Sequence, residues 1–90
     1  MSKNIQVCSM EGRSGKPVLN QFIISINNII YYQSYDSIIA RKENGSIYLD
    51  PDYYNYSVTT KKYLLRFLGI ENKIFKDNLK NNVYIFEKMN

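Results

Sequence analysis

The clearest apolar pattern in the chain lies in its first half and has the two-residue period of β-strands. Phe22, Ile24 and Ile26 recur at alternate positions, and a β-branched and aromatic run follows. Only Asn27 and Asn28 separate the two runs, and Asn tolerates the positive φ angles that a type I′ turn requires. The pattern therefore predicts a β-hairpin at the centre of the fold.

The two-residue turn fixes which residues face each other across this hairpin. It places Ile24 opposite Tyr31 on one side and Ile23 opposite Tyr32 on the other. Both sides carry apolar groups, so we expect the hairpin to be covered on one face and partly covered on the other. The sequence does not indicate which face is which.

Further strands precede and follow the hairpin. Asn44-Gly45 is the preferred pair for a second type I′ turn. In the register that this turn sets, Arg41 faces Tyr48, and we expect an exposed pair with the guanidinium over the ring. The strands predicted outside the central hairpin cover residues 4–10, 38–42, 47–49 and, as a short strand or extended tail, 83–86.

Two helices are predicted in the second half of the chain. The first follows an N-cap at Ser57 or Thr59 and ends before Gly69, with its apolar residues on one face. The second and weaker one covers about residues 71–80. The order β-β-β-β-β-α-α-β predicts an α+β fold: an antiparallel β-sheet of about five to six strands with two short C-terminal helices packed on one face. We expect a single domain over residues 1–90.

Composition narrows the class of protein. Twelve Lys and Arg against eight Asp and Glu give a net charge of +4, which permits contact with nucleic acid or another acidic surface. Ninety residues bury only a small core, which favours a homodimer. The single cysteine, Cys8, excludes an internal disulfide, and its apolar surroundings in the sequence predict a buried, inert thiol. Without a long apolar stretch or a signal segment, we expect a cytoplasmic protein and no membrane contact.

The residue types that most enzymes and metal sites need are scarce. The sequence has no histidine, one cysteine and scattered acids, so we expect no metal and no cofactor. A serine or cysteine nucleophile would lack its usual base, so we expect no enzyme activity. Asp36 interrupts an apolar run, and a turn explains it better than a catalytic role. Asp50 and Asp52 flank a proline, where a capping turn is favoured over a shared cation.

The loop from Gly12 to Pro17 combines two glycines with basic side chains. Such a loop can expose backbone N–H groups and bind an anion, aided here by Arg13 and Lys16. It lacks the residue spacing of a P-loop, and strands on both sides exclude the KH-type backbone clamp. The alternative, which we favour, is a solvated hairpin loop.

A third pattern combines aromatic and basic residues in the second half. Rings can stack on unpaired bases while cations follow phosphates, so the pattern indicates a surface for nucleic acid or another partner. The simpler interpretation, which its low specificity favours, is that the tyrosines wedge a helix onto the sheet and the lysines keep the protein soluble. With the two loop residues, the candidate binding residues are Arg13, Lys16, Tyr53, Tyr54, Lys61, Lys62, Arg66, Lys73, Lys76 and Lys80.

Three segments, GRSGKPVLNQF, YQSYDSIIA and YNYSVTTKKYLLRFLG, occur in this order. Together they resemble a family of small, uncharacterised proteins of phages and other mobile elements, over about residues 12–69. Tyr32 and Tyr54 stand where that family often has Phe and Trp, and Lys61 stands where Gly is common. The resemblance implies a mobile-element origin and brings no catalytic residues with it.

These observations leave competing functions. The first is a non-enzymatic binding protein that engages nucleic acid or a host nucleoprotein complex through a basic, tyrosine-rich surface. The second is a protein–protein inhibitor of a host defence system, similar to anti-CRISPR proteins, without direct nucleic-acid contact; surplus tyrosine suits such an interface. A cryptic enzyme that uses Asp36, the tyrosines or Lys16 is the least supported.

Overall fold

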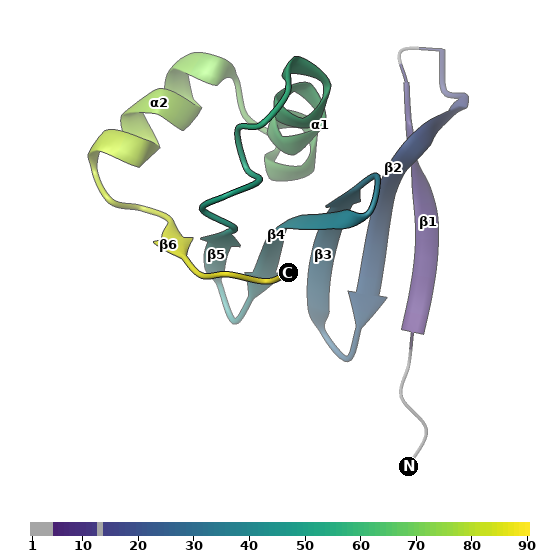
Figure 1. Cartoon of the computed structure of the whole chain (residues 1–90), viewed down its shortest axis with the longest axis horizontal. Helices are drawn as coiled ribbons and strands as arrows, with labels where there is room; N and C mark the ends of the chain where they lie inside the picture. The colour runs from purple at the N-terminus through teal and green to yellow at the C-terminus, as the bar shows by residue number, and fades with distance from the viewer. Residues whose placement is uncertain (1–4, 13) are drawn as a thin grey trace.

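The computed structural model describes residues 5–12 and 14–90, which form a six-stranded sheet and two helices (Figure 1). The strands lie in the sheet in their order along the chain, and every neighbouring pair but the last is antiparallel. β6 runs parallel to β5 because both helices cross between them. The elements are β1 (Ile5–Glu11), β2 (Pro17–Ile26), β3 (Ile29–Ser34), β4 (Ser37–Glu43), β5 (Ser46–Leu49), α1 (Val58–Leu68), α2 (Asn72–Lys80) and β6 (Ile85–Phe86). The predicted α+β fold is confirmed.

Both predicted type I′ turns form. Asn27 and Asn28 have φ angles of 49° and 70°, and Asn44 and Gly45 have φ angles of 51° and 78°. The resulting pairings of β2 with β3 and of β4 with β5 match those predicted from the turns. Asn and Gly accept positive φ at little cost, so these turns set the sheet register locally.

α1 begins and ends where its capping residues predict. The Ser57 hydroxyl accepts a hydrogen bond from the backbone N–H of Thr60 at 3.0 Å. Gly69 has φ 71° and donates its N–H to the carbonyl of Leu65 at 2.8 Å, which closes the last turn. Figure 1 shows both helices at one end of the sheet, with α2 on the side of β5 and β6 and with β1 at the opposite edge.

One buried cluster joins the sheet to both helices. α1 supplies Tyr63, Leu64 and Phe67, and α2 supplies Phe75. The Phe67 ring lies 5.8 Å from that of Tyr32 on β3, which anchors α1 on the sheet. The buried apolar residues of this cluster are Met10, Tyr32, Ile39, Ala40, Leu49, Tyr63, Leu64, Phe67, Phe75 and Tyr84.

A buried polar network lies beneath the start of α1. The Tyr32 hydroxyl is 2.5 Å from the side-chain oxygen of Gln21 and 3.2 Å from the backbone carbonyl of Thr60, so its single proton serves one of them at a time. The hydroxyls of Ser34 and Thr60 lie 3.0 Å apart. All four residues are fully buried, and burial raises the pKa of Tyr32 above its usual range. The hydrogen bonds of this network allow polar side chains to lie on the face of the sheet that α1 covers.

The helices therefore cover the face that carries Ile23 and Tyr32, and the opposite face, with Ile24 and Tyr31, has no helix over it. We call this second surface the outer face.

On β1 the prediction for Cys8 was wrong, because the thiol is exposed. An edge strand has a neighbour on one side only, and most of β1 is exposed.

Candidate functional site

The positive charge of the protein is concentrated on the helix pair. Between residues 57 and 82, six Lys and Arg stand against two acids, which gives this segment a charge of +4. The remainder of the chain has six basic and six acidic residues, so it is formally neutral. The whole net charge therefore belongs to α1, α2 and their connections. Such a concentration attracts anionic partners to one part of the surface.

The three lysines of α2 form a row on its solvent side. Phe75 is 1% exposed and turns toward the core, whereas Lys73, Lys76 and Lys80 are all exposed. Helical geometry places the three lysines within about 60° of one another around the axis and spreads them over roughly 10 Å. Within residues 5–12 and 14–90, none of them lies within 4.0 Å of a carboxylate. These charges are therefore available to a partner.

The basic residues of α1 are held more closely against the protein. Lys61 is half-buried, and its ammonium lies 6.0 Å from the Phe75 ring centre. Arg66 is exposed but donates a hydrogen bond to the backbone carbonyl of Glu11 at 2.5 Å. Lys62 is exposed, its ammonium lies 5.4 Å from the Tyr63 ring centre, and it borders an open groove. Val58, Lys61, Lys62, Leu65 and Asn72 line this groove between α1 and the start of α2.

The β1–β2 loop offers less for anion binding than its sequence indicates. The N–H of Gly12 donates to the carbonyl of Lys16 at 2.9 Å, and the N–H of Gly15 donates to the carbonyl of Gly12 at 3.1 Å. Both donors are thus used inside the loop, which favours the hairpin-loop interpretation over a nest. The Lys16 side chain is exposed. Arg13 lies outside the described residues.

The candidate tyrosines are packed against the protein. Tyr54 is partly buried, and its ring lies 6.4 Å from Phe75 of α2 and 5.5 Å from Phe86 of β6. Tyr53 is also partly buried and meets Tyr56 edge-on at 5.7 Å. Tyr54 therefore wedges α2 onto the sheet edge, as the simpler interpretation expected. Of these tyrosines, Tyr56 is the most open, with 47% of its surface exposed.

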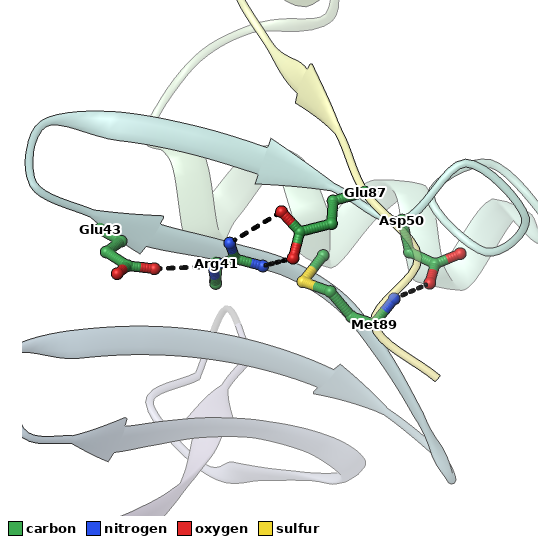
Figure 2. A network of polar contacts seen from close by, with 5 residues as sticks. All are labelled: Arg41, Glu43, Asp50, Glu87 and Met89. Carbon is green, nitrogen blue, oxygen red and sulfur yellow. Dashed lines mark hydrogen bonds and ion pairs between the residues drawn. The ribbon is translucent and has the colours of Figure 1, made fainter.

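A second polar cluster fastens the C-terminal tail to the sheet (Figure 2). The Arg41 guanidinium lies 3.9 Å from the centre of the Tyr48 ring, as predicted, and contacts Glu43 at 2.9 Å and Glu87 at 3.1 Å. Its side chain is only 13% exposed, so the expectation of an exposed pair was wrong; Glu87 arrives from the tail and covers it. The hydrogen bond with Glu87 raises the pKa of Arg41. Three of its five N–H donors are used in these contacts, so this guanidinium has a structural role.

Asp50 is the buried centre of the tail attachment. One carboxylate oxygen accepts the N–H of Asp52 at 2.9 Å and of Tyr53 at 3.2 Å. The other accepts the N–H of Met89 at 2.8 Å, drawn in Figure 2, and the amide of Asn90 at 2.9 Å. The capping turn predicted here is confirmed. Four donors saturate the carboxylate, which leaves it no free oxygen lone pair aimed at a substrate.

The sequence reasoning missed two residues with a positioning role. Lys42 donates from its ammonium to the carbonyl of Phe67 at 2.7 Å and lies 4.6 Å from the ring centre, so it satisfies the end of α1. The other is Glu87, which pairs with Arg41 across 46 residues of sequence. Alternation along β4 places Lys42 on the same face as Ala40, and this was the available signal.

Other kinds of site find little support in the described part of the chain. No group of three or more His, Cys, Asp or Glu side chains there could hold a metal ion. Neither helix in those residues has the length and hydropathy to cross a bilayer. Asp36 lies exposed in the turn between β3 and β4.

The fold and this surface define a small α+β protein whose excess positive charge lies on a helix pair. A family model described as a family of unknown function (DUF8033) matches residues 5–82, and the chain belongs to that family. Neither the comparison with curated proteins nor the comparison with solved structures gave a match. Membership agrees with the uncharacterised family that the sequence resembles, and it assigns no activity.

Proposed function

We propose that the protein is a non-enzymatic binding protein that engages nucleic acid, alone or within a host nucleoprotein complex, through the solvent side of α1 and α2. The observation that supports this most is the distribution of charge. The helix segment carries the entire +4, and the remainder of the chain is neutral. A protein that needed charge only for solubility would have no reason to place it all in one segment.

The contacts would be made to phosphates. The α2 row offers three unpaired ammonium groups over roughly 10 Å, and duplex DNA carries one charge per about 1.7 Å of axis. Lys62 of α1 adds an exposed ammonium group at the groove that Leu65 and Asn72 also line. Because Tyr53 and Tyr54 are partly buried, the proposal depends on the cations and gives base stacking a secondary role.

The setting is part of the proposal. The resemblance to proteins of phages and other mobile elements supports a role in the cytoplasm of a host cell, where a small protein can block a nucleoprotein complex of the defence system. Lysine contacts with phosphates carry no sequence information, which suits the sequence-independent binding that such a role would take.

Fluorescence anisotropy tests the direct form of this function. Labelled single- and double-stranded DNA and RNA of about 20 nucleotides are titrated with protein at about 20 mM salt and again at about 200 mM. We expect binding at low salt that weakens steeply at the higher concentration. If the protein binds none of the four nucleic acids at low salt, direct contact with nucleic acid is refuted.

The alternative is an inhibitor that contacts only host protein. Capture of partners from host lysate distinguishes this alternative from nucleic-acid binding. Tagged protein is incubated with lysate that has or has not been treated with nuclease. Nucleic-acid binding predicts that specific partners are lost after nuclease treatment. Partners that survive treatment, together with an absence of binding in the anisotropy assay, would favour a protein–protein inhibitor.

A further inference from the structure

The outer face carries an apolar surface that nothing in the described residues covers. Register and alternation place its side chains in rows across β1, β2 and β3. One row joins Ile5, Ile26 and Ile29, and the next joins Val7, Ile24 and Tyr31. Phe22 continues the surface in a third row. None of these residues belongs to the buried cluster or to the apolar residues packed against it.

The dimensions agree with an open face. The protein measures 39 × 34 × 20 Å, and about 20 Å is the depth of one sheet layer and one helix layer. On the outer face Ile5 is 55% exposed and Val7 is 61% exposed. Phe22, Ile24, Ile26, Ile29 and Tyr31 are half-buried, and an apolar cluster of this kind with no helix over it indicates an interaction surface.

Charge makes a second copy of this chain the best-fitting partner. The three rows contain no charged residue, so no charge would be buried unpaired when two such faces meet. At the rim, Arg41 is already paired with Glu43 and Glu87. The helices that carry the net charge lie on the other side of the sheet and would point away from the contact. Like-charge repulsion between copies is therefore small.

The area is sufficient for a dimer. Three strands about 4.8 Å apart, over a length of about 20 Å, give roughly 300 Å² of apolar face per copy, and the polar rim on β4 and β5 brings the contact to roughly 500 Å² per copy, or about 1,000 Å² in total. That is the lower size limit of specific interfaces. Pairing of two copies edge to edge along β1 would bury less than half as much, because one strand is only about 10 Å deep between its two faces.

We propose that the outer face is the interface of a homodimer, in which two sheets pack face to face and the helices lie on the outside. The result is a four-layer α/β/β/α arrangement with sheets about 10 Å apart. Its apolar centre is β1 to β3, and its polar rim includes the Arg41 cluster. Interfaces at the lower size limit are usually weak, so we expect a dissociation constant on the order of micromolar. The inference stands whether or not the helices bind nucleic acid.

Analytical ultracentrifugation tests this with three single lysine substitutions. The chain is 10.6 kDa, so the wild type should approach twice this mass at about 200 μM. Because of the two-fold axis, Ile24→Lys and Val7→Lys each place two added charges in the interface, one from each copy. We expect each substitution to raise the dissociation constant of the dimer at least about 100-fold. Val58→Lys is the matched control, because Val58 is 87% exposed on α1; it should leave the dimer intact.

The same variants can overturn the proposal. A wild type that stays monomeric at about 200 μM would refute it, and so would variants at Ile24 and Val7 that dimerise like the wild type. Circular dichroism checks that each variant is folded; Val7 is largely exposed, so its lysine variant should fold. Loss of the dimer in Val58→Lys as well would show that added charge, and not the outer face, is responsible.

A nitroxide on the single exposed cysteine distinguishes the two dimer geometries. Cys8 pairs with Ile23, on the helix side of the sheet, so face-to-face packing holds the two labels about 20 Å or more apart. Edge pairing along β1 would bring them to within about 10 Å. Weak spin–spin broadening in the dimer supports the proposal. Strong broadening would contradict it and assign the contact to the β1 edge.

Discussion

Replacing Asp50 with Asn should loosen the attachment of the C-terminal tail and destabilise the protein. The Asp50 side chain is 1% exposed and its carboxylate accepts four hydrogen bonds. An amide in its place keeps an acceptor for one pair of donors and turns its own N–H groups toward the other pair. Each charge-assisted bond lost costs about 1.5–3 kcal/mol, and relaxation of the tail recovers part of this. We expect a loss of about 2–4 kcal/mol in the free energy of unfolding.

Thermal and urea denaturation followed by circular dichroism measure this loss. For a chain of 90 residues, about 2–4 kcal/mol corresponds to a fall in Tm of roughly 10–25 °C. The matched control is Asp52→Asn, which makes the same chemical change at an exposed residue of the same turn and should shift stability by less than about 0.5 kcal/mol. Equal stabilities for Asp50→Asn and the wild type would refute the role assigned to this carboxylate.

The pH dependence gives an independent check. Burial alone would raise the pKa of Asp50, but the hydrogen bonds from Met89, Asn90, Asp52 and Tyr53 outweigh it and hold the pKa below its usual range. A depressed folded pKa means that the stabilisation is complete above the unfolded value of about 3.9 and is lost as pH falls through the folded value. The stability difference between wild type and Asp50→Asn should therefore be constant from pH 5 to pH 8 and shrink below about pH 4.

Three further substitutions test the packing of α1. Tyr32→Phe leaves the buried Gln21 side chain without its hydroxyl partner and should cost about 1–3 kcal/mol in urea denaturation; an unchanged midpoint would contradict the network. Ser57→Ala removes the cap on the Thr60 N–H and should cost about 1 kcal/mol, whereas Ser57→Asp should retain stability. Gly69→Ala places a β-carbon at φ 71° and should lower Tm by several degrees, about 1 kcal/mol; a rise in Tm would contradict the left-handed geometry.

The two hairpins could be predicted because their signals are local. Asn27-Asn28 and Asn44-Gly45 set turn type and register within a few residues of themselves. The choice of covered face could not be predicted in the same way. Both faces of the hairpin are apolar, and the covered one is distinguished by Tyr32, which contacts Thr60 some 28 residues away. Contacts of that range leave no periodic trace in the sequence.

Some residues of the candidate site could likewise be predicted from the sequence and others could not. The lysine row of α2 follows from helical periodicity alone, and the structure leaves it exposed. Alternation along β4 and the local turn indicate the face of Lys42 and the capping role of Asp50, but their distant partners, 25 and 39 residues away, could not be read from the sequence. For Cys8, in contrast, a local signal in the sequence gave a wrong prediction. Its apolar neighbours indicated burial, but β1 became an edge strand and left the thiol exposed.

The most direct test of the central claim, that α1 and α2 bind phosphates, is the slope of log Kobs against log salt concentration. It is measured for the wild type, for Lys73→Gln/Lys76→Gln/Lys80→Gln, and for the same three positions changed to Arg, which keeps the charge. We predict that the Gln variant loses up to about 0.9 of slope per phosphate contact on duplex DNA, about 2.7 in total, while the Arg variant keeps the wild-type slope. Identical slopes for all three proteins would contradict the account.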